Sequence, residues 1–181
     1  MKKIVIAVVV LLVVGVGALF AINGKSHYDP SRYSLEIEPQ NSPFGVGSSI
    51  SFTLPDQFDK AHSLSPDTKK LIFVFTKATG HTFKSYMSDK PASFLDKRKI
   101  VAVADISGMP TVIFNTFALP DFRKSSYTLL LIHDKNMAKR LKENRDTKKI
   151  VVMSLERGKV TKIDYATDEK SLGKLIEGEK N

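Results

Sequence analysis

The feature that most constrains the fold is an uninterrupted apolar run at residues 71–75, Leu-Ile-Phe-Val-Phe. A short run rich in β-branched and aromatic residues is typical of a strand that is buried on both faces. Sheets built from such strands are covered by helices on both sides. The run therefore predicts an α/β domain in which residues 71–75 form the central strand.

The rest of the pattern predicts the other elements of this domain. Strands are predicted at residues 49–54, 100–106, 127–132, 150–155 and 159–165, and helices at residues 83–97, 110–119, 135–144 and 168–177. Apolar strands that alternate with helices indicate parallel crossovers. Glu156-Arg157-Gly158 indicates an antiparallel β-hairpin between the last two strands. The sequence thus predicts a mixed sheet.

The first 22 residues predict export. Lys2 and Lys3 precede nineteen residues, 4–22, that carry no charge. This pattern matches either a signal peptide, which is removed, or an N-terminal membrane anchor, which remains. Both alternatives stay open. The two lysines favour a cytoplasmic N-terminus, which places the rest of the chain in the periplasm. An uncleaved segment would hold the protein in the inner membrane through residues 4–22.

The next segment, residues 23–47, is predicted to be a linker. It is polar and contains Pro30, Pro39 and Pro43, which are typical of irregular structure. Alternating apolar and polar residues predict one short strand within it, at residues 33–38. The globular domain is predicted to cover residues 48–181.

Composition excludes two classes of function. The formal net charge is +9, but the lysines are interspersed with acids and no nucleic-acid-binding motif occurs. We therefore predict that the protein has no nucleic-acid partner. The chain also contains no cysteine, so it forms no disulfide and carries out no thiol chemistry.

Several sequence segments resemble the peroxiredoxin/TlpA branch of the thioredoxin-like proteins. Residues 52–60, Phe-Thr-Leu-Pro-Asp-Gln-Phe-Asp-Lys, followed by His62-Ser63-Leu64, are similar to the opening of that branch. Residues 71–75 resemble its first core strand, residues 127–141 a later strand and helix, and residues 150–176 its terminal hairpin and helix. The resemblance implies a thioredoxin-like three-layer α/β/α sandwich with a central mixed sheet and a C-terminal β-hairpin plus helix.

Within this branch, Ser107-Gly108-Met109 together with the hairpin looks most like the exported YtfJ-type proteins. The family's cysteine positions fall at residues 80–83, and none of them is cysteine. Thiol exchange and peroxide reduction by the family's chemistry both need a thiolate, so both are excluded. The proline that usually precedes the hairpin strand is missing near Lys149. The resemblance therefore implies a fold and a compartment rather than a reaction.

One candidate ligand site follows the central strand, because open α/β sheets bind ligands at the carboxyl ends of their strands. Residues 76–82 are predicted to be a loop leading into a helix that begins near residue 83. The candidate ligand-binding residues are Lys77, Thr79, Gly80, His81, Thr82 and Lys84. Their cations and hydroxyls would suit an anion at a helix N-terminus. A solvated loop without a ligand is the alternative.

The other candidates are an aromatic face and two acids. Phe114, Phe117 and nearby Phe122 belong either to the core or to a surface that binds a partner. Asp105 and Asp134 end predicted strands, and we favour turn and capping roles over an acid–base pair. The histidines are not spaced as metal ligands and no cofactor motif occurs, so we predict neither a metal nor a cofactor.

These observations favour an exported, redox-inactive thioredoxin-like protein that acts as a binding or interaction module in the cell envelope. Its partner would be a periplasmic protein or a small ligand. The lack of cysteine favours a non-catalytic role. The alternative is a periplasmic enzyme, or an oxidoreductase accessory protein, that uses a non-thiol cofactor without a local sequence motif.

Overall fold

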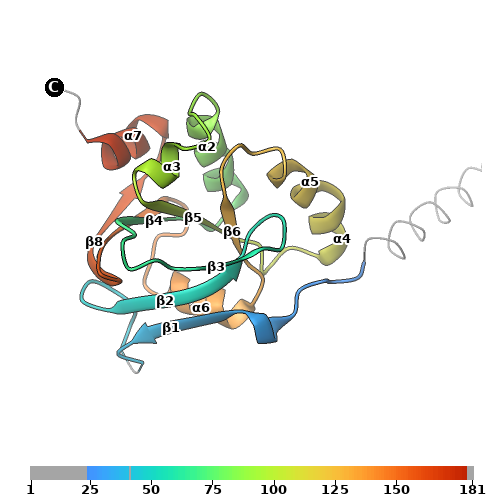
Figure 1. Ribbon diagram of the computed structural model, residues 1–181, viewed down its shortest axis with the longest axis horizontal. Helices are drawn as coiled ribbons and strands as arrows, with labels where there is room; N and C mark the ends of the chain where they lie inside the picture. Colours follow the sequence, from blue (N-terminus) through green and yellow to red (C-terminus); the bar gives the residue numbers. More distant parts are fainter. Residues whose placement is uncertain (1–23, 41, 179–181) are drawn as a thin grey trace, which may run out of the picture. The chain divides into compact units, whose positions relative to one another are not determined.

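The computed structural model describes residues 24–40 and 42–178 (Figure 1). The described residues form two compact units. The larger unit contains Asp29–Gly108 and the chain from Ser125 onward, and the smaller contains residues 24–28 and Met109–Lys124. The predicted signal peptide or anchor, residues 1–22, lies outside the described residues. Within the described ranges, no helix has the length and apolar character needed to cross a bilayer.

The larger unit is built on a mixed sheet with the strand order β1-β2-β8-β7-β4-β5-β6, to which β3 adds by pairing with β2. Its strands are β1 (Ser34–Glu38), β2 (Ser49–Pro55), β3 (Ala61–Ser63), β4 (Lys70–Val74), β5 (Ile100–Asp105), β6 (Leu129–Ile132), β7 (Ile150–Glu156) and β8 (Lys159–Ala166). Its helices are η1 (Pro30–Arg32), α2 (Lys77–Met87), α3 (Phe94–Lys97), α6 (Lys135–Lys142) and α7 (Glu169–Glu177).

Strand directions follow the predicted alternation of strands and helices. β4, β5 and β6 are parallel, whereas β7 pairs antiparallel with both β4 and β8. Residues 71–74 lie at the centre, paired with β5 on one side and with β7 on the other. The predicted mixed sheet with a buried central strand is therefore confirmed.

Helices cover both faces of this sheet. In Figure 1, α2, α3 and α7 lie on one side of the strands and α6 lies on the other. Phe73 and Phe75 stack at 5.6 Å and share a buried cluster with Ala138 and Leu141 of α6. Because side chains alternate along a strand, Ile72 faces the opposite helices. The predicted α/β/α sandwich, closed by a hairpin and a helix, is thereby confirmed.

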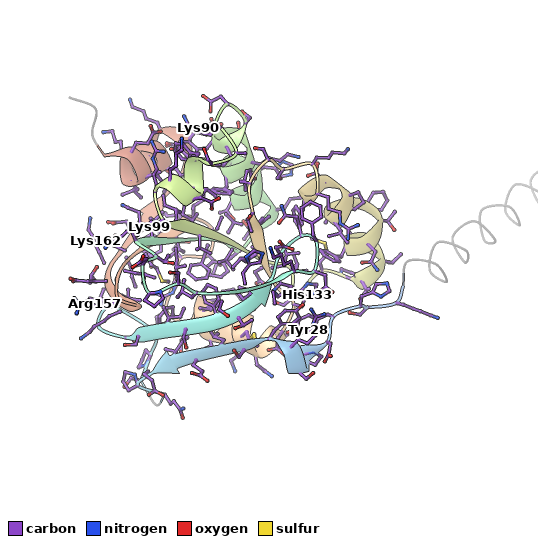
Figure 2. All side chains as sticks on the ribbon, viewed as in Figure 1. Tyr28, Lys90, Lys99, His133, Arg157 and Lys162 are labelled. Atoms are coloured by element: carbon purple, nitrogen blue, oxygen red, sulfur yellow. The ribbon has the colours of Figure 1, made fainter. Side chains whose placement is uncertain are left out.

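The hairpin between β7 and β8 forms because its two turn residues adopt left-handed backbone angles. Arg157 has φ +50° and Gly158 has φ +78°, which are the angles that a tight hairpin turn with the correct twist requires. Arg157 lies at this turn in Figure 2. A Cβ at Gly158 would also come within 3.4 Å of the Ile50 carbonyl oxygen. The sequence signal for this turn is confirmed.

The segment expected to be a linker, residues 23–47, contributes to the sheet and to the core. Residues 34–38 form β1 and pair with β2 in antiparallel register. The side chains of Tyr33, Ile37 and Phe44 are buried. Arg145 holds the end of the segment, because it donates to the Phe44 carbonyl at 2.7 Å and lies 4.6 Å from the Phe44 ring. The structure differs from the expected linker because these apolar side chains pack into the domain.

The β6 edge of the sheet is closed by the residues that follow β2, where Asp56 forms an isolated antiparallel bridge with Leu130 and Gln57 contributes a buried side chain. Gln57 is 2% exposed, and its amide nitrogen donates to the Tyr127 carbonyl at 2.8 Å. Its amide oxygen accepts the Leu129 N–H at 2.9 Å. The Asp56–Leu130 bridge and the Gln57 amide together take the place of a neighbouring strand.

The C-terminal helix α7 is fastened at both ends. Asp168 caps its first turn by accepting the Ser171 N–H at 2.7 Å. Near its other end, Glu177 accepts a hydrogen bond from the Tyr86 hydroxyl of α2 at 2.8 Å. Burial, followed by the bond to Glu177, raises the pKa of Tyr86. Lys90, labelled in Figure 2, lies 5.1 Å from the Tyr86 ring.

The smaller unit contains one helical run assembled from α4 (Thr111–Ile113), η2 (Phe114–Ala118) and α5 (Leu119–Phe122). The sequence predicts that this helix ends before Pro120, and that prediction is wrong. The middle part, η2, is a π-helix in which the Leu119 N–H reaches back to the Phe114 carbonyl. Proline has no N–H and breaks regular α-helical bonding. The wider turn before Pro120 lets the run continue.

Candidate functional site

The predicted ligand-binding loop is the first part of helix α2. The helix begins at Lys77 rather than near residue 83, and Thr76 is its N-cap. The Thr79 N–H donates to the Thr76 hydroxyl at 3.2 Å, and the Thr76 N–H donates to the Thr79 hydroxyl at 3.0 Å. This reciprocal capping box starts the helix early. Sequence reasoning missed it because threonine here replaces the Glu or Gln that usually marks the motif.

The helix separates the six candidate residues. Thr79 is buried inside the cap, while Gly80 and Thr82 are half-buried. Lys77, His81 and Lys84 are exposed and follow i, i+4, i+7 spacing, which places them on one helix face. Their imidazole and amines therefore gather on one surface. The cap, however, already uses two N–H groups that an anion would need at this helix start.

The three candidate aromatic residues do not share one exposed surface. Phe114 is buried and Phe122 is half-buried. Phe117 is 63% exposed, and Ile113, one turn before it, is 44% exposed. The exposed apolar surface of this helical run therefore consists of Ile113 and Phe117.

The two strand-end acids have structural partners. The Asp105 side chain forms an ion pair with Lys142 at 2.7 Å and also accepts the Ser107 N–H at 2.9 Å. Asp134 is the N-cap of α6 and accepts the N–H groups of Asn136 and Met137, each at 2.8 Å. These contacts agree with the turn and capping roles favoured from the sequence.

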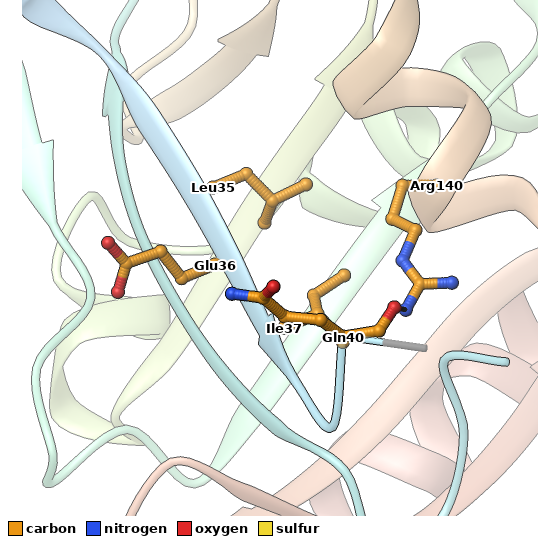
Figure 3. Close-up of a pocket in the computed structure, with 5 residues that line it drawn as sticks. All are labelled: Leu35, Glu36, Ile37, Gln40 and Arg140. Atoms are coloured by element: carbon orange, nitrogen blue, oxygen red, sulfur yellow. Dashed lines mark hydrogen bonds between the residues drawn. The ribbon is translucent and has the colours of Figure 1, made fainter. Parts of the chain in front are cut away.

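A hollow that sequence reasoning missed lies beside β1. It has a volume of about 230 Å³. It is lined by Leu35, Glu36, Ile37, Gln40 and Arg140, and we call it the β1 hollow (Figure 3). The carbonyls of Gln40 and Ser42 accept hydrogen bonds from the Arg140 guanidinium at 2.9 and 2.6 Å. Glu143 accepts a further bond from it at 2.7 Å. Arg140 thus fixes the wall of the hollow.

A second cluster of polar groups surrounds the turn between β2 and β3. Asp56 is buried and accepts the N–H groups of Phe58 and Lys60 at 2.7 and 3.0 Å. Its other oxygen lies 2.8 Å from Nε2 of His62. Burial alone would raise the pKa of Asp56, but the bonds from Lys60, His62 and Phe58 outweigh burial and lower it. Because these bonds engage both oxygens, Asp56 holds the turn.

We expect His133 to make the stability of the larger unit dependent on pH. Burial lowers the pKa of His133 from 6.5 to about 4, although nearby Asp59 acts in the opposite direction. Between these two values the unfolded chain binds more protons than the folded chain, so acidification through this window destabilises the fold. We expect His133→Asn to lose less stability than the parent between pH 7 and pH 4.5. The difference should be of order 1 kcal/mol, because partial exposure weakens the effect.

Urea unfolding at both pH values measures this difference, and the carboxyl groups common to both proteins cancel in the comparison. An NMR titration of the His133 ring gives the pKa directly. A ring pKa near 6.5, or equal pH dependence in the two proteins, would contradict the assignment.

No family model and no curated protein matches this sequence. Solved structures that resemble the fold include an uncharacterised thioredoxin-like protein from Porphyromonas gingivalis, with 16% identity and a TM-score of 0.46 over 69% of this chain and 84% of that one. StoA from Bacillus subtilis has 15% identity and a TM-score of 0.43 over 67% and 92% of the two chains. A thiol peroxidase from Chromobacterium violaceum has 14% identity and a TM-score of 0.45 over 75% and 88%.

The chain has an α/β fold with a central mixed sheet and contains no cysteine. The similarity to the solved structures concerns the fold alone. The sites are therefore argued from this chain's own residues.

Proposed function

We propose that this protein is an exported, redox-inactive thioredoxin-like interaction module of the cell envelope. The proposal excludes thiol chemistry because the chain has no cysteine at any position. Export is supported by Lys2 and Lys3 before an uncharged apolar segment. The local likeness of residues 107–109 to exported YtfJ-type proteins supports the same compartment.

The observation that carries the proposal is the β1 hollow beside an open sheet edge. In the part of the chain that the structure describes, β1 pairs only with β2, whereas Gln57 closes the β6 edge. An extended segment of a partner protein can pair with such an edge and place alternate side chains in a flanking hollow. Leu35 and Ile37 share the face of β1 that lines the hollow.

The size of the β1 hollow favours a protein segment over a small-molecule ligand. Sites for cofactors and drug-sized ligands have volumes of about 300–1,000 Å³, and the β1 hollow has about 230 Å³. It can therefore accept one large apolar side chain. Arg140 preforms its wall through bonds to backbone carbonyls, which reduces the cost of ordering the site on binding.

The negative charge of β1 further limits which partner sequences can bind at this edge. Glu36 and Glu38 are exposed, and their side chains alternate with those of Leu35 and Ile37 along β1, so they place negative charge at the edge of the hollow. Cross-strand pairs of opposite charge stabilise a sheet, whereas pairs of like charge destabilise it. The edge therefore favours a basic extended segment, and it disfavours pairing with β1 of a second copy. The expected partner sequence has one large apolar residue with Lys or Arg at alternate positions.

A displayed library of short peptides tests this function. The full chain in detergent is screened, and the affinities of the enriched peptides are measured by fluorescence anisotropy. We expect the enriched peptides to contain an apolar residue flanked by basic residues. Leu35→Asp should weaken binding by about tenfold or more, because it places a charge in the apolar wall. Phe58→Asp is the matched control, since Phe58 is 58% exposed and does not line the hollow.

Binding that is unchanged by Leu35→Asp would contradict the site. Native mass spectrometry of the protein recovered from its source provides a second check. A stoichiometric cofactor would favour the enzyme alternative instead.

A further inference from the structure

The helical run at residues 111–122 exposes two large apolar side chains that the interaction site does not use. Ile113 is 44% exposed and Phe117 is 63% exposed. They are four residues apart, so they project from the same side of the run. We call this surface the Ile113–Phe117 face.

A hydrogen bond ties this run to the chain near the N-terminus. The side-chain amide of Asn115 donates to the Lys25 carbonyl at 3.0 Å. Asn115 lies midway between Ile113 and Phe117 in sequence, about half a turn from each, so its side chain leaves the opposite side of the helix. The bond therefore holds the helix from behind and leaves the Ile113–Phe117 face outward.

The position of Lys25 limits how far this helix can lie from a bilayer. The apolar segment, residues 4–22, ends only three residues before Lys25. Three residues span at most roughly 10 Å of extended chain, and the headgroup layer on each side of a bilayer is about 5–7 Å deep. With residues 4–22 in the membrane, Asn115 is thus held at or just above the headgroups.

We propose that the Ile113–Phe117 face inserts into the interfacial layer of the bilayer that holds residues 4–22. This inference rests on the retained-anchor form of the proposed function. The sequence around the face suits a lipid surface, because Lys25, Arg123 and Lys124 supply cations for anionic headgroups. The face provides a second contact with the membrane beside the anchor and keeps the domain close to it.

The absence of cysteine makes a direct test possible, since a single introduced cysteine can be labelled without background. Phe117→Cys in the full chain is labelled with an environment-sensitive dye and reconstituted into phosphatidylcholine–phosphatidylglycerol vesicles. Lipids with a nitroxide near the headgroup serve as quenchers. We expect them to reduce emission from position 117 by about twofold or more. Phe58→Cys, in the larger unit, is the matched control and should keep its emission.

Two results would overturn the inference. A dye at position 117 that is quenched by aqueous iodide as fully as the dye at position 58 places the face in water. A dye protected from iodide but untouched by nitroxide lipid places a protein, such as a second copy, on the face. Ile113→Cys repeats the test in case the change at position 117 disturbs the fold.

Mass spectrometry of the protein recovered from its source membranes distinguishes a failure of this inference from a failure of the retained membrane anchor on which it rests. Retention of residues 1–22 with a water-exposed dye means that the inference alone fails. Removal of residues 1–22 means that the segment is not a retained anchor, and the inference is then wrong as well. Neither result affects the peptide-binding test of the β1 hollow.

Discussion

Phe44→Ala should lower the free energy of unfolding by about 3–5 kcal/mol. Phe44 is 2% exposed, and its ring lies 4.6 Å from the Arg145 guanidinium. Truncation removes the buried ring, leaves a cavity, and deprives the partly buried Arg145 of its aromatic neighbour. Chemical denaturation followed by circular dichroism measures the loss. The effect should be large even though the residue belongs to a stretch whose composition is typical of a linker.

Phe58→Ala is the matched control for this loss. Phe58 is 58% exposed, so its truncation should change stability by no more than about 0.5 kcal/mol. A chain that begins at residue 48 gives a second test, because it lacks both β1 and Phe44. We expect it to unfold without a cooperative transition. A small effect of Phe44→Ala, or a stable chain from residue 48, would return residues 29–47 to the role of a linker.

Gln57→Leu should cost about 2–4 kcal/mol. The change leaves the Tyr127 carbonyl and the Leu129 N–H without the partner that Gln57 provides, and each unmet buried group costs about 1–3 kcal/mol. The loss appears as a lower midpoint of urea unfolding. Hydrogen exchange of the Leu129 amide should also become faster, because this N–H loses its acceptor.

Gln57→Glu distinguishes the contribution of the hydrogen bonds to stability from the contribution of packing. An ionised carboxylate can accept from Leu129 but cannot donate to Tyr127, whereas a protonated carboxyl group can do both. Burial favours the protonated form and raises the pKa of the new carboxyl group. The loss of unfolding free energy in Gln57→Glu, relative to the parent, should therefore become smaller as the pH falls from 7 to 4.5. A stability difference that is constant or increases over this pH range would show that the hydrogen bonds of the Gln57 amide do not stabilise β6.

The sequence predicts the parts of the fold that are determined locally. The apolar run at residues 71–75 identifies the central strand, and Arg157-Gly158 identifies the hairpin. Two local features were harder to recognise. The Thr76–Thr79 capping box uses an uncommon residue at its third position, and the π-helix before Pro120 depends on hydrogen bonding that composition does not encode.

The β1 hollow was missed because it is assembled from distant parts of the chain. Arg140 bonds to the carbonyl of Gln40, 100 residues earlier, and no local pattern predicts such a contact. The burial of Ile37 likewise depends on pairing with β2 and not on its neighbours in sequence. The alternation at residues 33–38 did predict the strand, so the available signal indicated its conformation but not its place in the sheet.

The Gln57 amide also limits how complexes of this protein can grow. A chain that offers two open strand edges can pair at both, and repeated pairing of that kind produces open-ended fibres. Along the described sheet path, the β6 end is already occupied by the Asp56–Leu130 bridge and the Gln57 amide, so a strand added at β1 has no successor at that end. At its two ends, this path can therefore grow at β1 and not at β6.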